Sequence, residues 1–428
     1  MKGETKKMKK EKLALLGGEK TVVTKHEFKW PIITEEEISE VVKIMRKGEI
    51  SISKVVKEFE QDFAAYHGVK YALAQNNGTA ALHSACFAVG VEPGDEVIVP
   101  SYTWWATATP ILSCNGIPIF CDIDPKTLCA DPQDIRRKIT PYTKAIIVTH
   151  MWGHPCEMDE IMKIAKLYKI AVIEDASHAH GAIYKGRKVG TIGDIGCFSL
   201  QGSKPMVAGE GGILITNNQE YYERAVALGH YELINELPSD KYKKYAHTGL
   251  GWKYRMHPLA AAIAKVQLKY LDERIEMRRR NLEYLTMGLT GIRGIRPPYT
   301  APYVTRGGWY EYRILYEPEE LQGVSRENFI KALQAEGVKI DTERYPLLHL
   351  EPLFQERNLY GKGCPWSCLY AKRKVTYQKG DLPVSEKIHS QLMSLPPFTL
   401  PCRELLDQYI KAFKKVTENL HQLRQAFL

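Results

Sequence analysis

The chain has 428 residues, 44% of them hydrophobic and 25% charged, which predicts a folded protein large enough for one large and one smaller domain. No apolar stretch could span a bilayer and no secretory leader opens the chain, so we expect a cytoplasmic protein without a membrane partner. The formal net charge is +9, but much of the excess lies in residues 1–12. A basic tail without a zinc finger, an RNA-binding motif or a repeat does not indicate nucleic acid.

Residues 1–34 are expected to form a basic tail and an arm ahead of a large α/β domain over residues 35–285. Within that domain short β-branched runs alternate with helical patterns, and residues 157–169 repeat apolar side chains at helical spacing. This alternation predicts a mostly parallel sheet flanked by helices, with the ligand at the carboxyl ends of the strands. The strands are expected at residues 71–75, 95–100, 117–123, 144–150, 170–175, 196–200 and 212–216.

The pattern changes beyond residue 285. Residues 291–300 contain two glycines and two prolines and indicate a linker into a smaller α+β domain over residues 286–428. Residues 344–366 form a long irregular segment containing His349, and such segments often face the substrate in compact enzymes. The regular elements expected in this domain are a strand at 309–318, a helix at 325–337 capped by Ser325, and a long amphipathic helix at 402–423.

The nine cysteines are scattered and show no repeated CxxC pattern. This distribution favours free thiols in a reducing compartment over a disulfide framework or a zinc site. Cys364 and Cys368 are the closest pair, but no second pair of ligands accompanies them, so we expect no metal.

Polar and aromatic side chains follow two of the predicted strands. Gly78 and Thr79 come after the first strand, where exposed N–H groups at a helix start would suit a phosphate; a capped helix after a turn is the alternative. Trp104 and Trp105 follow the second strand. We expect one of these tryptophans in the core and the other stacked on a planar ring.

Two charged residues carry the strongest chemical signal. Asp175 ends an otherwise apolar strand, where a carboxylate needs a cationic partner, either a protonated pyridine nitrogen or an arginine. His178 and His180 follow it and indicate no function alone, because a lone histidine is more often a packed core residue. Lys204 is flanked by small residues, which suits an amine that must be neutral and must have room for an aldehyde.

Five motifs occur in order along the chain: "NNGTAAL", "PSYTWWATA", "VIEDASHAHGA", "GDIGCFSLQGSK" with "GEGG", and "KYRMHPLAAAIAKVQL". As an ordered set they resemble the DegT/DnrJ/StrS family of pyridoxal-phosphate-dependent sugar aminotransferases, from about Gly17 to the C-terminus. The resemblance implies the fold type I transferase architecture and a homodimer with active sites at the subunit boundary. It implies that Lys204 forms the internal aldimine and that Asp175 keeps the pyridine nitrogen protonated.

The same resemblance implies roles for further residues around pyridoxal 5'-phosphate. Trp104 matches the aromatic position that stacks on the ring, and His178 matches a site that lies against the cofactor. The residues matching the phosphate-binding positions are Gly78, Thr79 and Ser199. Many relatives read "GYNYRM" where this chain reads "GWKYRM", so Lys253 replaces an asparagine that reaches the cofactor phosphate of the opposite subunit. A lysine could make that contact as a charge-assisted bond, or the role could be lost.

The function implied is transfer of an amino group from glutamate or glutamine, through pyridoxamine phosphate, to a keto-sugar or keto-cyclitol. The segment 344–366 is longer than in the shorter nucleotide-sugar aminotransferases and looks closer to the cyclitol branch, which includes the glutamine:scyllo-inosose aminotransferases, and to the aminohydroxybenzoate synthases. His349, Trp152 and His154 are candidates for the acceptor pocket, although a packed turn is an alternative for the last two. A lyase or dehydratase of the same fold is a further alternative, which Lys204 disfavours because dehydrating relatives replace it. A regulator that binds the cofactor without catalysing a reaction is another alternative.

Overall fold

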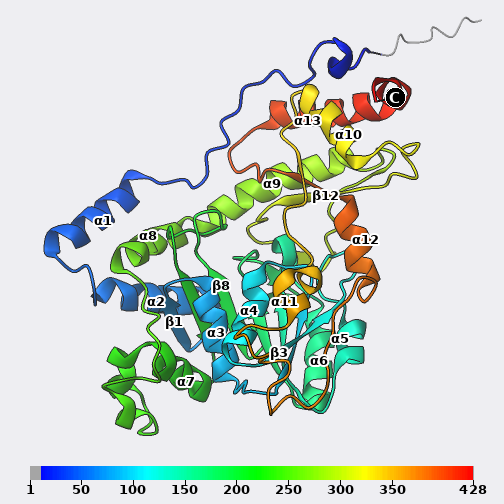
Figure 1. Cartoon of the computed structure of the whole chain (residues 1–428). Helices are drawn as coiled ribbons and strands as arrows, with labels where there is room; N and C mark the ends of the chain where they lie inside the picture. The colour runs from blue at the N-terminus through cyan, green and yellow to red at the C-terminus, as the bar shows by residue number, and fades with distance from the viewer. Residues whose placement is uncertain (1–10, 428) are drawn as a thin grey trace, which may run out of the picture.

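The computed structural model describes residues 11–427, so most of the predicted basic tail lies outside the described part of the chain. Its centre is a seven-stranded sheet in the order β1-β9-β8-β5-β4-β2-β3 (Figure 1). The strands are β1 (Tyr71–Gln75), β2 (Glu96–Pro100), β3 (Ile117–Cys121), β4 (Thr143–Thr149), β5 (Ala171–Asp175), β8 (Ile195–Ser199) and β9 (Gly212–Thr216). All seven predicted strands are therefore confirmed.

The directions of the strands bring most of their carboxyl ends to one edge of the sheet. The pairs β3–β2, β2–β4, β4–β5 and β5–β8 are parallel, whereas β9 runs antiparallel to both β8 and β1. Six strands thus share one direction and β9 alone runs opposite. The predicted α/β architecture with a mostly parallel sheet is confirmed, and the loops at this edge can meet in one site.

Hydrophobic cores lie on both faces of this sheet. Phe198 and Ile213 pack in a cluster with residues of α2 and α8, while Cys197 and Leu214, their neighbours along the strands, pack in the cluster on the other face. This alternation follows from the pleat of a strand, which turns successive side chains to opposite faces. The helices of this part are α1 (Glu35–Lys47), α2 (Lys54–His67), α3 (Gly78–Ala88), α4 (Trp105–Ser113), α5 (Pro132–Lys138), α6 (Met158–Tyr168), α7 (Gln219–Gly229), α8 (Pro258–Lys269) and α9 (Leu271–Leu289).

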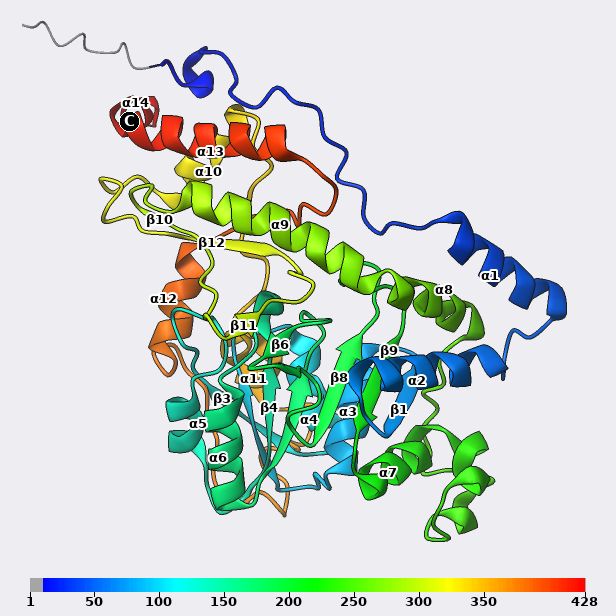
Figure 2. The same cartoon turned by 180° about the vertical axis from the view of Figure 1, so that it is seen from behind.

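A second layer of structure is built around the end of α9, the long helix that runs across the molecule (Figure 2). Its core joins the last turns of α9 to the small sheet and to the C-terminal helices, and it includes Leu13 from the N-terminal segment. The small sheet has the order β10-β12-β14-β13. Because α9 runs across residue 285, the boundary placed there stays a prediction. The elements are β10 (Ile295–Arg296), β12 (Tyr312–Tyr316), α10 (Arg326–Ala335), β13 (Asp341–Thr342), α12 (Pro383–Gln391) and β14 (Leu392–Leu395).

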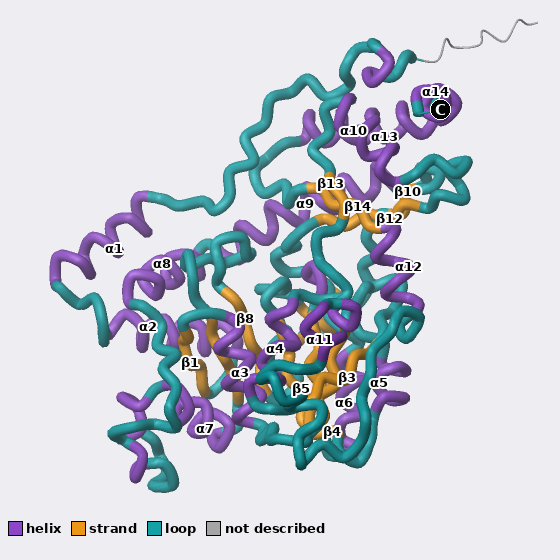
Figure 3. The backbone as a smooth tube through the Cα atoms, viewed as in Figure 1, coloured by secondary structure: helices purple, strands orange, loops and turns teal. Residues whose placement is uncertain are grey.

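The C-terminal region differs from the predicted pattern in two places (Figure 3). The single long helix expected at 402–423 is two helices, α13 (Arg403–Glu418) and α14 (Leu420–Ala426), because Asn419 leaves helical geometry between them. The segment expected to be irregular contains the short helix α11 (Pro352–Glu356). The cap predicted for α10 is confirmed, since the Ser325 hydroxyl accepts a hydrogen bond from the backbone N–H of Asn328 at 3.2 Å.

The expectation that all cysteines are free thiols is wrong for one pair. Cys364 and Cys368 form a disulfide, because the turn between them brings their Cα atoms to 4.9 Å. The other seven cysteines are free. No helix within residues 11–427 combines the length and the apolar character needed to cross a membrane.

Candidate functional site

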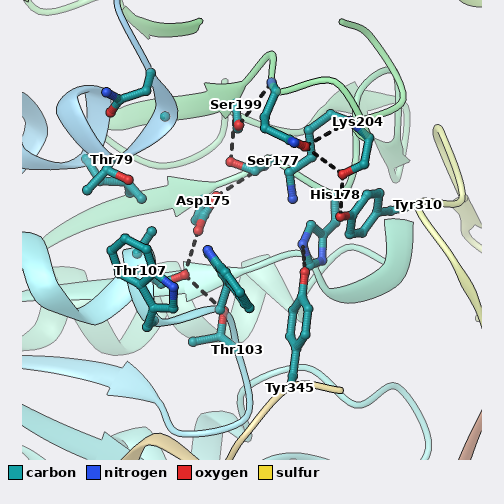
Figure 4. Close-up of a pocket in the computed structure, with 18 of the residues that line it drawn as sticks. Thr79, Thr103, Thr107, Asp175, Ser177, His178, Ser199, Lys204, Tyr310 and Tyr345 are labelled. Atoms are coloured by element: carbon teal, nitrogen blue, oxygen red, sulfur yellow. Dashed lines mark hydrogen bonds between the residues drawn. The ribbon is translucent and has the colours of Figure 1, made fainter. Parts of the chain in front are cut away.

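A cavity of about 440 Å³ opens at the carboxyl ends of β1, β2, β5 and β8 (Figure 4). It lies where the topology of a parallel sheet places a ligand. The predicted residues that line it are Gly78, Thr79, Trp104, Asp175, His178, Ser199 and Lys204. Seven residues chosen from separate motifs therefore meet in one place.

Asp175 is buried at the floor of this cavity and lacks a cation. Its carboxylate accepts hydrogen bonds from the Thr107 hydroxyl at 2.8 Å and from the backbone N–H of Ser177 at 3.1 Å. No lysine, arginine or histidine in the described chain lies within ion-pair distance of it, so the alternative of a structural arginine partner is not realised. A carboxylate that is buried and unpaired is suited to receive the cation of a ligand.

Lys204 lies on the opposite wall, with 7% of its surface exposed. Its ammonium sits 4.0 Å from the centre of the Tyr310 ring and makes no ion pair with any carboxylate of residues 11–427. Burial lowers the pKa of the Lys204 amine, against the opposing effects of Tyr310 and Asp175. The amine is consequently easier to deprotonate than that of a surface lysine, as nucleophilic attack on an aldehyde requires.

The start of α3 forms the third wall. Gly78 and Thr79 are the first two residues of α3 and line the cavity, and the first N–H groups of a helix have no intrahelical partners. The Asn77 side chain caps the helix by accepting from the N–H of Ala80 at 2.8 Å. Gly78 packs so closely on β8 that a Cβ atom there would lie 2.7 Å from Cβ of Ser199. The helix start is therefore held against Ser199, which gives an anion-binding corner.

Aromatic rings line the side of the cavity next to Lys204 (Figure 4). The His178 ring stacks on Tyr310 at 4.4 Å and on Trp152 at 5.1 Å between centroids, and its Nε2 atom lies 3.1 Å from the Tyr345 hydroxyl. Burial, reinforced by the positive charges of Lys204 and Arg313, lowers the pKa of His178 well below its ordinary value. The imidazole is therefore neutral at pH 7, and its Nδ1 atom has no partner in the described structure.

The two tryptophans at the end of β2 differ from the expectation that one is a core residue. Trp104 and Trp105 are both exposed at the mouth of the cavity, by 39% and 45%. Trp104 is the residue before α4 and Trp105 is its first residue. Trp104 lies against Tyr345 at 5.1 Å between ring centroids and remains the candidate to stack on a planar ligand.

The residues suggested for the acceptor are not among those lining this cavity. Trp152 is buried behind His178, and His154 packs in the same turn, where its Nε2 atom accepts from the N–H of Ala301 at 3.2 Å. The Nδ1 atom of His349 forms a hydrogen bond with the hydroxyl of Ser101 at 2.7 Å. Lys253 is exposed and also does not line the cavity of its own chain.

Several lining residues were absent from the sequence-based set: Thr107, Ser177, Gln201, Ser203, Glu210, Tyr310, Arg344 and Tyr345. Thr107 and Ser177 had a detectable signal, because both follow predicted strand ends within a few residues. Tyr310 lies in a predicted strand of the smaller domain, and no local pattern ties it to the site. Arg344 and Tyr345 are the first two residues of the segment 344–366, which was expected to face the substrate, although neither was singled out.

Comparison with known proteins gives a consistent result. Residues 31–414 match the model of the DegT/DnrJ/EryC1/StrS aminotransferase family. The chain is 33% identical to an L-glutamine:2-deoxy-scyllo-inosose aminotransferase of Streptoalloteichus tenebrarius, covering 85% of this chain and 88% of the relative. It is 38% identical to the GDP-perosamine synthase of Caulobacter vibrioides, covering 71% and 79%. A Streptococcus pneumoniae protein solved in its PLP form superposes with a TM-score of 0.78 at 25% identity, covering 93% and 100%.

The cavity also fits pyridoxal phosphate on its own geometry. The unpaired carboxylate of Asp175 would hold the ring nitrogen as a cation, the start of α3 with Ser199 would hold the phosphate, and Lys204 would bind the aldehyde. These three groups lie on separate walls of one cavity, as a ligand with three different ends requires. With the match over residues 31–414, it follows that the chain belongs to the DegT/DnrJ/EryC1/StrS aminotransferase family and is a pyridoxal-phosphate-dependent aminotransferase.

Proposed function

We propose that the enzyme transfers an amino group from glutamate or glutamine to a keto-sugar or keto-cyclitol. The observation that carries the proposal is the pairing, in one cavity, of a buried amine without a carboxylate partner and a buried carboxylate without a cation. The substrate class is supported by relatives named for a deoxy-scyllo-inosose and for GDP-perosamine. The first name gives a keto-cyclitol as the amino acceptor, and the second gives a nucleotide-linked amino-sugar as the product.

The roles of the chain's own residues follow from their positions. Pyridoxal phosphate, when bound, supplies an electron sink for the carbon that loses a proton. Asp175 would hold the ring nitrogen of the cofactor, and the orientation of its carboxylate is set by the hydroxyl of Thr107 and by the N–H of Ser177. The Nζ atom of Lys204 takes the proton from the donor carbon and later delivers one to the acceptor carbon.

The ring cluster assists by excluding water and fixing the orientation of the reactants. His178 is neutral and is held by stacking on Trp152 and Tyr310, so its unpartnered Nδ1 atom can hydrogen-bond a bound ligand. Trp104 at the mouth offers an exposed face for a planar ring.

The test is spectroscopic. The purified holoenzyme is mixed separately with L-glutamate and L-glutamine, and the visible absorbance of the cofactor is followed. We expect bleaching with one donor and recovery when the right keto-sugar or inosose from a panel is added. An absorbance that responds to neither donor, or full turnover in a Lys204→Ala variant, would contradict the proposal.

We also propose a homodimer with shared active sites. Exposed apolar side chains gather on α1 and the segment after it, at the edge of the molecule where α1 packs on α8 (Figure 1). A second copy would cover such a surface. The exposed apolar residues there are Ile38, Met45, Ile50 and Ile52. Light scattering of the purified protein should give twice the chain mass of 48.7 kDa, and a value of one chain mass would contradict the assembly.

Lys253 would reach the cofactor phosphate of the partner in this assembly. Its side chain is exposed and forms no hydrogen bond or ion pair within residues 11–427, so it is available for such a contact. Lys253→Ala should weaken cofactor binding by about 10-fold, the size of one charge-assisted contact. Lys244→Ala removes an exposed lysine of the same segment and serves as the control. Equal affinity in the two variants would remove this role.

A cytoplasmic location is part of the same proposal. It is supported by the seven free cysteines, since secreted proteins tend to pair theirs. Fractionation of cells that make the protein tests the location, and recovery outside the cytoplasm would contradict it.

A further inference from the structure

Arg344 is the only arginine among the residues that line the cavity. Its Nη2 atom donates to the Tyr310 hydroxyl at 3.0 Å and pairs with the carboxylate of Glu311. Its Nε and Nη1 atoms make no hydrogen bond to the described residues, and 54% of its side chain is exposed. One edge of the guanidinium is thus anchored, and the other edge is free to bind a ligand.

The neighbouring Arg313 differs from Arg344 because it is buried and its charge is fully paired. It is 1% exposed and pairs with Glu343 at 2.7 Å and Glu311 at 2.5 Å. Glu311 therefore divides its two oxygen atoms between two arginines. Arg344 shares its counter-ion, so its positive charge is only partly compensated at the cavity.

Arg344 and Lys204 also contact the same aromatic ring. The guanidinium carbon of Arg344 lies 5.9 Å from the centre of the Tyr310 ring, and the Lys204 amine lies 4.0 Å from it. A ligand with an anionic group beside a reacting carbon could contact both residues at once. An amino-acid donor has this shape, because its carboxylate is attached to the carbon that carries the amino group. A keto-cyclitol has no carboxylate.

We propose that Arg344 binds the α-carboxylate of the amino-acid donor through Nε and Nη1, an inference that rests on the proposed aminotransferase function. A guanidinium edge matches a carboxylate with two parallel hydrogen bonds, which fixes orientation as well as affinity. Glu311 and Tyr310 hold the guanidinium in place for this contact. Arg344 is then a specificity residue for the donor half of the reaction and has no part in the acceptor half.

The experiment separates the two halves of the reaction in the holoenzyme. The half-saturation concentration is measured from the cofactor absorbance with L-glutamate, L-glutamine and a carboxylate-free amine, scyllo-inosamine. Glutarate serves as an unreactive carboxylate competitor. The variants are Arg344→Gln and Arg344→Lys. The control is Arg187→Gln, which removes a half-exposed arginine that is paired with Asp159 outside the cavity.

Arg344→Gln should raise the half-saturation concentration of the amino acids and the inhibition constant of glutarate by at least about 10-fold. The value for scyllo-inosamine should stay within about twofold, and Arg344→Lys, which keeps the charge without the planar edge, should fall between. Equal weakening of all ligands, or none, would overturn the proposal. So would weakening confined to a nucleotide-linked keto-sugar, which would assign Arg344 to a phosphate. An unaltered enzyme that responds to no amino acid would instead contradict the proposed function, and this inference with it.

Discussion

Replacing Gly78 by alanine tests the anion-binding corner directly. An added Cβ would lie 2.7 Å from Cβ and 3.0 Å from Cα of Ser199, whereas carbon atoms in contact lie about 3.5–4.0 Å apart. One of these neighbours is backbone of β8, so no side-chain rotation relieves the contact and the start of α3 must move by several tenths of an ångström or more. Overpacking of this kind costs about 1–3 kcal/mol.

We therefore expect Gly78→Ala to lower the free energy of unfolding by about 1–3 kcal/mol and to weaken pyridoxal phosphate binding by about 10-fold or more. Denaturant unfolding of the apoprotein measures the first quantity, and titration of the apoprotein with the cofactor measures the second. Gly202→Ala is the matched control, since a Cβ there meets nothing closer than 3.7 Å. If both variants bind the cofactor equally well, the reasoning about the start of α3 is refuted.

Three further predictions concern charge. Asp175→Asn keeps the shape of the side chain but removes the unpaired charge, so turnover should fall by at least about 100-fold, and near-normal turnover would contradict its role. Because burial lowers the pKa of Lys204, acetylation of the apoprotein should reach half its maximal rate at a lower pH for this lysine than for exposed ones; a higher midpoint would contradict that effect. Lys415→Met leaves the buried carboxylate of Glu336 without the ammonium 2.9 Å away, so the free energy of unfolding should fall by about 3–5 kcal/mol, and an unchanged value would show that the pair is dispensable.

The floor of the site was predictable because its residues obey a rule of topology. Thr79, Asp175 and Ser199 follow or end strands that a β-branched pattern reveals, and parallel strands bring such ends to one edge. The order of the strands was not predictable, because β9 inserts between β1 and β8 through pairings remote in sequence. Local patterns do not encode such pairings.

The residues that the smaller layer contributes to the site were not predicted individually, for a related reason. Tyr310 reaches the cavity only because the smaller layer packs over the sheet, and a strand pattern at 309–318 does not reveal that. Arg344 begins the segment 344–366 that was expected to face the substrate, but its residue type alone did not single it out. His154 and His349, the residues suggested for the acceptor, do not line this cavity and instead hydrogen-bond to groups far along the chain, the N–H of Ala301 and the hydroxyl of Ser101. Residue type alone did not separate the residues that line the cavity from those that pack elsewhere.

The central claim is that Lys204 is the lysine that binds pyridoxal phosphate. Reduction of the holoenzyme with borohydride fixes the cofactor onto the amine that holds it, and mass spectrometry of the digested protein locates it. The account predicts the cofactor mass on the peptide containing Lys204, and its loss in Lys204→Ala. The cofactor mass on a different lysine, or unchanged labelling of the variant, would contradict the account.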